Sequence, residues 1–199
     1  MSDSASRRKF ARAAARLAAT AGCALPALIL ITDDERLPDP VAAARALPRG
    51  AIVIARARDA AKRQRLAQAL RSVAREGGLF LLIAGDVALA RRLGADGVHL
   101  PEMRIGEAAS IRAQSSLIVT ASAHSLAALR KASAVDALIL SAVFATNSHP
   151  GAPSLGCLRG AMMARQFPLP VYALGGITAK NAGRLTGFCG LAAIGALKA

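Results

Sequence analysis

The stretch AIVIARARDAAKRQRLAQALRSVAREGGLFLLIAGDVALARRLGADGVHL (51–100) decides the fold class. It contains three short apolar runs, separated by segments in which apolar residues recur every three or four positions. This spacing predicts helices over 59–78 and 86–97, with Gly78 and Gly94 near their ends. The apolar runs are nearly continuous rather than alternating, which is typical of parallel strands buried on both faces.

The same rhythm continues along the whole chain. Further helical segments are expected over 125–136 and 177–185. Eight repeats of strand and helix predict a single (β/α)8 TIM barrel over 27–197, within one domain of 1–199. The alternative is a doubly wound open sheet, whose GxGxxG turn is replaced here by TDDERLPDP (32–40). The eight runs are ALILIT (27–32), AIVIA (51–55), LFLLIA (79–84), GVHL (97–100), LIVTAS (117–122), ALILSAVF (137–144), VYALGG (171–176) and GLAAIGAL (190–197).

The N-terminal segment 1–24 is predicted to form an extra basic helix. Over 5–20 it is amphipathic, with one apolar face that consists of Phe10, Ala13, Ala14 and Leu17. The sequence reaches Ala199 soon after the eighth run, so we expect a truncated last helix and an N-terminal helix covering that end of the barrel. SRRKFAR (6–12) is also compatible with a twin-arginine export signal, although no A-x-A site follows it.

Composition narrows the choice of partners and compartment. The net charge is +14, but only 3% of the residues are aromatic and no Trp occurs. Scattered Arg residues without stacking platforms argue against a nucleic-acid partner, and no apolar run is long enough for a membrane span. The three cysteines are far apart and form no CxxC pair, which favours a reducing, cytoplasmic location. The composition is also compatible with a homo-oligomer.

In such barrels the chemistry lies where strands end and loops begin. Gly175 and Gly176 follow the seventh predicted strand, and Gly195 lies at the end of the eighth. Backbone N–H groups at glycine turns bind anions, so these three glycines are candidate phosphate-binding residues. Arg56 and Arg58 end the second strand and project to the same side, which suits binding of a substrate anion.

Three histidines lie near the ends of neighbouring strands. His99 lies within a strand, where a structural role is the commoner case, whereas His124 and His149 lie on loops and are candidate acid–base catalysts. A three-histidine zinc site is an alternative, although no HxH or HxxxH pair exists. The loop 142–156 is Pro- and Gly-rich and contains Thr146, Asn147 and Ser148 before His149, which suits a substrate lid.

Five motifs resemble the thiamine phosphate synthase/TenI family in content and order. They are LILITD (28–33), GADGVHL (94–100), SAHS (122–125), VFATNSHPGAP (143–153) and ALGGI (173–177). The resemblance implies a (β/α)8 barrel that acts in thiamine biosynthesis. It further implies one of two activities. The synthase joins a hydroxymethylpyrimidine diphosphate to a thiazole phosphate with Mg²⁺, whereas TenI-type thiazole tautomerases need no metal and move a proton with a histidine.

The chain matches only part of the family pattern at the positions where the synthase binds pyrimidine diphosphate and metal. Arg56 and Arg58 match the Arg and Lys of the family pattern, whereas Ile54 replaces its Gln. Ala84-Gly85 (84–85) replaces an Asn-Asp pair, and Arg104 replaces the other metal-binding Asp. Neither family carboxylate remains, and Mg²⁺ requires hard oxygen ligands. The nearest substitutes are Asp86, one position late, and Glu102, two positions early.

Other family positions are partly retained. His124 aligns with the histidine that moves the proton in the TenI branch, although SAHS also occurs in synthases. The diphosphate-binding Lys of the family becomes His149, and the Ser of its second phosphate site becomes Gly195. Both branches of the family bind a phosphorylated thiazole.

These observations favour a TenI-like protein that binds a phosphorylated thiazole or thiamine phosphate without Mg²⁺. A genuine synthase, with Mg²⁺ as cofactor, and a non-catalytic binding or regulatory relative are the alternatives. No metal ligand is predicted. The expected site comprises catalytic His124 and His149, phosphate-binding Gly175, Gly176 and Gly195, and substrate-binding Arg56, Arg58, Arg104, Thr146 and Ser148.

Overall fold

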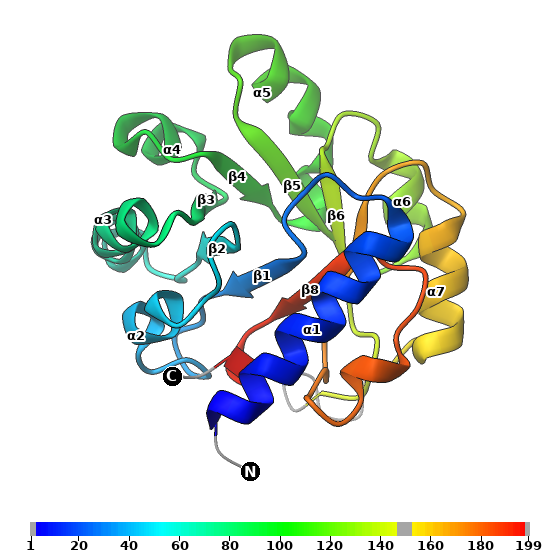
Figure 1. The fold of residues 1–199 in the computed structure, drawn as a ribbon. Coiled ribbons are helices and arrows are strands. Elements are labelled where there is room, and N and C mark those ends of the chain that lie inside the picture. Colours follow the sequence, from blue (N-terminus) through cyan, green and yellow to red (C-terminus); the bar gives the residue numbers. More distant parts are fainter. Residues whose placement is uncertain (1–2, 147–152, 198–199) are drawn as a thin grey trace.

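A computed structural model describes residues 3–146 and 153–197 of the chain. Its strands are parallel and close into a barrel in sequence order, with the eighth strand pairing to the first (Figure 1). The predicted (β/α)8 barrel is therefore confirmed, and an open doubly wound sheet is excluded. The strands are β1 (Leu28–Ile31), β2 (Ile52–Ala55), β3 (Phe80–Ala84), β4 (Gly97–Leu100), β5 (Ile118–Ala123), β6 (Ala137–Leu140), β7 (Val171–Ala173) and β8 (Gly190–Ala193).

Helices and short 3-10 turns surround this barrel (Figure 1). For most of the chain these elements follow the predicted alternation of strands and helices. They are α1 (Asp3–Ala21), α2 (Pro40–Arg45), α3 (Ala60–Gly77), α4 (Val87–Leu93), η1 (Glu102–Glu107), α5 (Ala108–Gln114), α6 (Leu126–Lys131), α7 (Cys157–Arg165), η2 (Ala182–Arg184) and η3 (Gly195–Leu197). Within the described ranges, no helix has the length and apolar character needed to span a bilayer.

The core has two parts because successive strand residues point to opposite faces. One part fills the barrel interior, where Ile29, Ile54, Leu82 and Ile139 are at most 1% exposed. The other part lies between the strands and the surrounding helices, and it is built mainly from Ala, Leu and Val. Full burial of an Ile or Leu side chain contributes roughly 1.5–3 kcal/mol, so the continuous apolar runs supply most of the driving force.

Local signals explain where the helices begin and end. Asp59, Asp86 and Ser125 precede α3, α4 and α6, and each side chain accepts a hydrogen bond from the N–H three residues later, at 2.7–3.1 Å. Such N-caps satisfy amide groups that have no partner in the first turn. Gly78 and Gly94 terminate α3 and α4 in the left-handed conformation, with φ of 60° and 58°.

The helix α1 lies against β8, η2 and β1, as Figure 1 shows for the blue helix beside the red strand. Its predicted apolar face is buried: Phe10 is 0%, Leu17 1%, Ala14 1% and Ala13 8% exposed. The described chain after β8 forms only the 3-10 turn η3. The expectation that the N-terminal helix covers this side of the barrel is therefore confirmed.

The segment 177–185 differs from its prediction. It forms a turn and the short η2 instead of an α-helix. The Asn181 side chain accepts the Thr178 N–H at 2.8 Å and donates to the Gly176 carbonyl at 2.9 Å. Such side-chain bonds compete with helical ones. Arg16 of α1 also donates to the carbonyls of Gly183 and Leu185, at 3.2 and 2.8 Å. The tertiary packing of α1 thus stabilises the turn.

Candidate functional site

The predicted site residues that the structure describes all follow the carboxyl ends of barrel strands. Arg56 and Arg58 follow β2, Arg104 lies in η1 after β4, and His124 follows β5 directly. The remaining described residues are Thr146 after β6, Gly175 and Gly176 after β7, and Gly195 at the start of η3. Ser148 and His149 lie outside the described residues. Because parallel strands of a barrel end at one face, the fold places these groups around one mouth.

His124 is exposed at this mouth and is bonded to the neighbouring strand ends. Its ring Nδ1 lies 3.0 Å from the Ser141 hydroxyl and 3.2 Å from the Ser141 carbonyl oxygen. Its backbone N–H donates to Oε2 of Glu102 at 2.6 Å. Ser141 thus orients the ring and Glu102 fixes the backbone of the same residue, which suits a group that transfers protons.

Arg56 lies in an ion-pair cluster with the loop after β1. Its guanidinium donates to Oδ2 of Asp33 at 2.8 Å, and Arg36 donates to the same oxygen at 2.7 Å. Hydrogen bonds from Arg36, which outweigh the effect of burial, hold the pKa of Asp33 well below its usual value. The Thr32 hydroxyl also links β1 to the backbone of Arg56. One face of the mouth therefore carries two guanidinium groups around one carboxylate.

Arg58 is much more exposed than Arg56. Its side chain lies 3.2 Å from Glu35, and these two side chains are 76% and 70% exposed. Such a surface ion pair contributes about 0–1 kcal/mol, so Arg58 can exchange Glu35 for another anion at little cost. Its backbone N–H donates to Asp34, which is paired with Lys62 at 2.7 Å.

Arg104 joins the loops that follow β3 and β4. Its Nε and Nη2 atoms donate to the two carboxylate oxygens of Glu107, both at 2.6 Å, and its Nη1 donates to the Gly85 carbonyl at 2.7 Å. The hydrogen bonds raise the pKa of Arg104 and lower that of Glu107. This bidentate pair leaves Arg104 committed to protein partners.

Gly175 and Gly176 form a tight turn beneath the loop after β6. Gly176 has a φ of 61°, and a Cβ atom there would lie 2.2 Å from the Ala145 carbonyl oxygen. Only glycine fits so close an approach. In the described parts of the chain, neither glycine N–H donates a hydrogen bond. The two amides are therefore available to an anion, and the close approach is an independent structural reason for the glycines.

His99 lies inside the barrel below this mouth and is 6% exposed. Its Nδ1 and Nε2 atoms lie 2.9 Å from the Thr120 hydroxyl and 3.0 Å from the Ser122 hydroxyl. Burial, with a smaller effect of the Arg56 charge, lowers the pKa of His99 from 6.5 to about 4. Both ring nitrogens are thus bonded to hydroxyl groups, which fits the structural role expected for it. Over the described ranges, no group of three metal-binding side chains occurs.

We expect His99 to make stability depend on pH. The neutral ring is kept in the folded chain, whereas the unfolded chain binds a proton below about pH 6.5. The folded pKa is the lower one, so this contribution is complete at pH 7 and decreases as the pH falls towards 4. Chemical denaturation is expected to show a loss of about 2 kcal/mol between pH 7 and pH 5. A His99→Asn variant, although less stable overall, should lose much less over this interval. An equal loss in both proteins would contradict the assignment.

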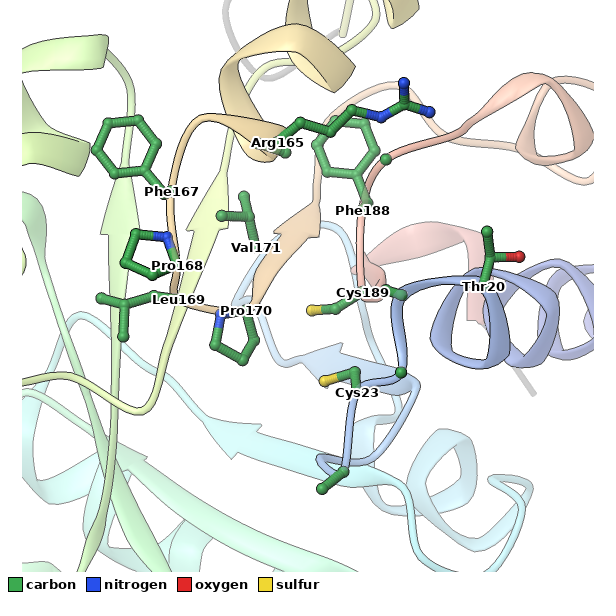
Figure 2. Close-up of a pocket in the computed structure, with 15 residues that line it drawn as sticks. Thr20, Cys23, Arg165, Phe167, Pro168, Leu169, Pro170, Val171, Phe188 and Cys189 are labelled. Atoms are coloured by element: carbon green, nitrogen blue, oxygen red, sulfur yellow. The ribbon is translucent and has the colours of Figure 1, made fainter.

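A cavity of about 470 Å³ lies at the other end of the barrel. Figure 2 shows Cys23 and Cys189 on its wall, with Phe167 and the segment 168–171 leading into β7. These residues precede their strands, so the cavity is separate from the predicted site. Burial raises the pKa of the Cys189 thiol, which makes it a poor nucleophile.

Two residues of the mouth were not assigned to the site from the sequence: Asp33, which pairs with two arginines, and Ser141, which contacts the ring of His124. Glu102 was considered only as a substitute metal ligand, whereas it accepts the His124 backbone N–H. Asp33 belongs to the motif LILITD and directly follows the first predicted apolar run, so its position was a usable signal. Ser141 carried no comparable signal, because its role depends on the register between β5 and β6.

The closed barrel, with polar groups that follow the carboxyl ends of its strands, defines a (β/α)8-barrel protein. The chain belongs to the thiamine monophosphate synthase family, whose TMP-TENI model matches residues 28–197. This family acts in thiamine biosynthesis.

Individual relatives agree with this assignment. The chain is 32% identical over 168 residues to the thiamine-phosphate synthase of Thioalkalivibrio sulfidiphilus, with 79% of this chain and 80% of that protein covered. It is 37% identical over 116 residues to the putative thiamine-phosphate synthase 2 of Aquifex aeolicus, but that match covers only 57% of this chain and 62% of the relative.

Solved structures support the same fold. The thiamine phosphate pyrophosphorylase from Pyrococcus furiosus superposes with a TM-score of 0.67 and 28% identity, with 84% of each chain covered. The N-(5'-phosphoribosyl)anthranilate isomerase from the same organism reaches a TM-score of 0.56 at 11% identity, which is a likeness of fold alone.

Proposed function

We propose that this protein acts on a phosphorylated thiazole by TenI-type tautomerisation, without Mg²⁺. The observation that carries the proposal is the bonding of Arg104. The synthase pattern has a metal-binding Asp at this position, and here a guanidinium bridges Glu107 and the Gly85 carbonyl. The resemblance implies that the synthase binds its metal between the loops after β3 and β4, and in this protein the Arg104 guanidinium joins those two loops.

The residues present do not fit the magnesium site implied by the family. Three carboxylates lie close to the replaced positions, and each already has partners. Asp86 caps α4 and lies 3.6 Å from Arg63, Glu102 accepts the His124 N–H, and Glu107 is paired with Arg104. Mg²⁺ needs several oxygen ligands in near-octahedral geometry, and these contacts would have to break to supply them. The proposed reaction therefore has no metal-dependent step.

The chemistry proposed needs only proton transfer. His124 removes one proton from a carbon of the thiazole tautomer and returns one proton to another position of the same molecule, so the substrate changes its double bonds but not its composition. Imidazole suits this task because it is the side chain that most often serves as a general acid or base. His149 is proposed as a second acid–base group, with Thr146 and Ser148 in the loop that covers the substrate.

The phosphate of the substrate is assigned to the glycine turns. Gly175 and Gly176 offer backbone N–H groups, and Gly195 lies at the end of the adjacent strand. Arg56 and Arg58 offer positive charge on the other side of the mouth, and Arg58 is free to exchange its exposed partner. Arg104 is proposed to act on charge at longer range, since its hydrogen bonds are already satisfied.

Two alternatives remain. A genuine synthase is favoured by the names of the relatives and by Arg56 and Arg58, which match two basic positions of the synthase pattern. A non-catalytic relative that binds a phosphorylated ligand is favoured by the glycine turn, which needs no catalytic group to function. The identity of the ligand and the oligomeric state are further points for experiment.

We expect turnover to be independent of magnesium. The purified protein is first given hydroxymethylpyrimidine diphosphate and thiazole phosphate, with Mg²⁺ or with EDTA, and thiamine phosphate is measured. It is then given the thiazole tautomer carboxylate phosphate under both conditions. Isomerisation at equal rates with Mg²⁺ and EDTA is the expected result. Efficient Mg²⁺-dependent formation of thiamine phosphate would overturn the proposal, and phosphate-dependent binding without turnover would support the non-catalytic alternative.

A further inference from the structure

His124 is held at two points by residues that come from the strands on either side of β5. The first point is its backbone. The His124 N–H donates to Oε2 of Glu102 at 2.6 Å, and Glu102 begins η1 after β4. A carboxylate acceptor makes this bond stronger than one between neutral groups. The bond ties the end of β5 to the loop of the neighbouring strand.

The second point is the ring. The Nδ1 atom lies 3.2 Å from the Ser141 carbonyl oxygen and 3.0 Å from its hydroxyl. A carbonyl oxygen can only accept a hydrogen bond, whereas a hydroxyl can accept or donate. Both contacts are satisfied together when Nδ1 carries the proton. Ser141 is itself held in place, because its N–H donates to the Ala123 carbonyl at 3.0 Å.

This arrangement determines which nitrogen of the neutral ring is basic. With the proton on Nδ1, the lone pair lies on Nε2, and across the described residues Nε2 makes no hydrogen bond. We infer that Ser141 and Glu102 are positioning residues for His124: Ser141 holds the ring in the Nδ1–H tautomer, which leaves Nε2 as the base, and Glu102 fixes the backbone from which the ring projects. The part that concerns turnover rests on the proposed function, whereas the part that concerns the tautomer does not.

The tautomer is measured directly by NMR on the full-length, ¹⁵N-labelled protein at a pH at which His124 is neutral. The His124→Gln variant identifies the signals of this ring among the three histidines. We expect the wild-type protein to show Nδ1 protonated and Nε2 unprotonated. In Ser141→Ala the carbonyl remains and the hydroxyl is lost, so the share of the Nδ1–H form is expected to fall. The control is Ser133→Ala, which changes an exposed serine between α6 and β6.

Kinetics then test the two positioning residues. Glu102→Ala and Ser141→Ala are each expected to lower kcat roughly tenfold with little change in KM. Glu102→Ala removes a hydrogen bond to the His124 backbone and Ser141→Ala removes one to its ring, and neither touches the proposed phosphate site. Glu102→Gln keeps an oxygen that accepts the His124 N–H, so it should recover most of the activity. Ser133→Ala should match the wild type. Circular dichroism of each variant shows whether it is folded.

The outcomes separate this inference from the proposed function. A wild-type ring with its proton on Nε2 would overturn the inference, whatever the activity. If Ser141→Ala left the tautomer and kcat unchanged, Ser141 would not be a positioning residue. If kcat fell equally in Glu102→Ala and Glu102→Gln, the hydrogen bond to the His124 backbone would not explain the effect of Glu102. An Nδ1–H ring in a protein without tautomerase turnover would support the tautomer assignment and reject the proposed function.

Discussion

His124→Ala is expected to reduce the isomerisation rate by about 100- to 10,000-fold, which is the usual contribution of one general acid–base group. The residue is exposed, and among the described residues its ring is hydrogen-bonded only to Ser141, so stability should change little. The loss should appear in kcat rather than in KM, because the phosphate site proposed at the glycine turns does not include His124. Steady-state rates with the thiazole tautomer carboxylate phosphate provide the measurement.

A matched control is available in the second described histidine. His99→Asn alters a buried ring that lies below the mouth and is bonded to Thr120 and Ser122. It is expected to lower stability more than His124→Ala, and to lower kcat less. If the two substitutions had the reverse effects, His99 would be the better candidate for proton transfer. An unchanged rate in His124→Ala would remove His124 from the mechanism.

Phe10→Ala is expected to cause the largest loss of stability among single substitutions in α1. Phe10 is 0% exposed and belongs to the face of α1 that covers the barrel. Truncation of a buried Phe costs about 3–5 kcal/mol, because it removes apolar contact and leaves a cavity. Urea denaturation followed by circular dichroism measures this loss. Lys9→Ala changes the adjacent exposed residue of the same helix and should stay within about 0.5 kcal/mol of the wild type.

The result tests whether α1 is part of the barrel fold. If Phe10→Ala lost as little stability as Lys9→Ala, α1 could detach without affecting the stability of the barrel strands. The packing of α1 on β8 and β1 argues for the opposite result. Arg16, which donates to two carbonyls beside η2, adds a polar link to the same surface.

The fold class was predictable because its signal is local and repeated. Continuous apolar runs mark strands buried on both faces, and the capping residues Asp59, Asp86 and Ser125 directly precede the helices that they start. The amphipathic face of α1 was predictable for the same reason. The segment 177–185 was not, because the bonds of Asn181 and the approach of Arg16 from α1 decide its shape, and Arg16 is distant in the sequence.

By itself, the sequence determined the eight-stranded barrel, the covering N-terminal helix and which residues lie at the carboxyl ends of the strands. It also showed that Arg104 stands where the family pattern has an acidic residue. Only the tertiary structure decided what these groups do to one another: that Arg104 is bound to Glu107 and Gly85, and that Ser141 and Glu102 hold His124. The physical reason is that strand order and register bring these side chains within hydrogen-bonding distance, and neither can be read from the spacing of residues within one segment.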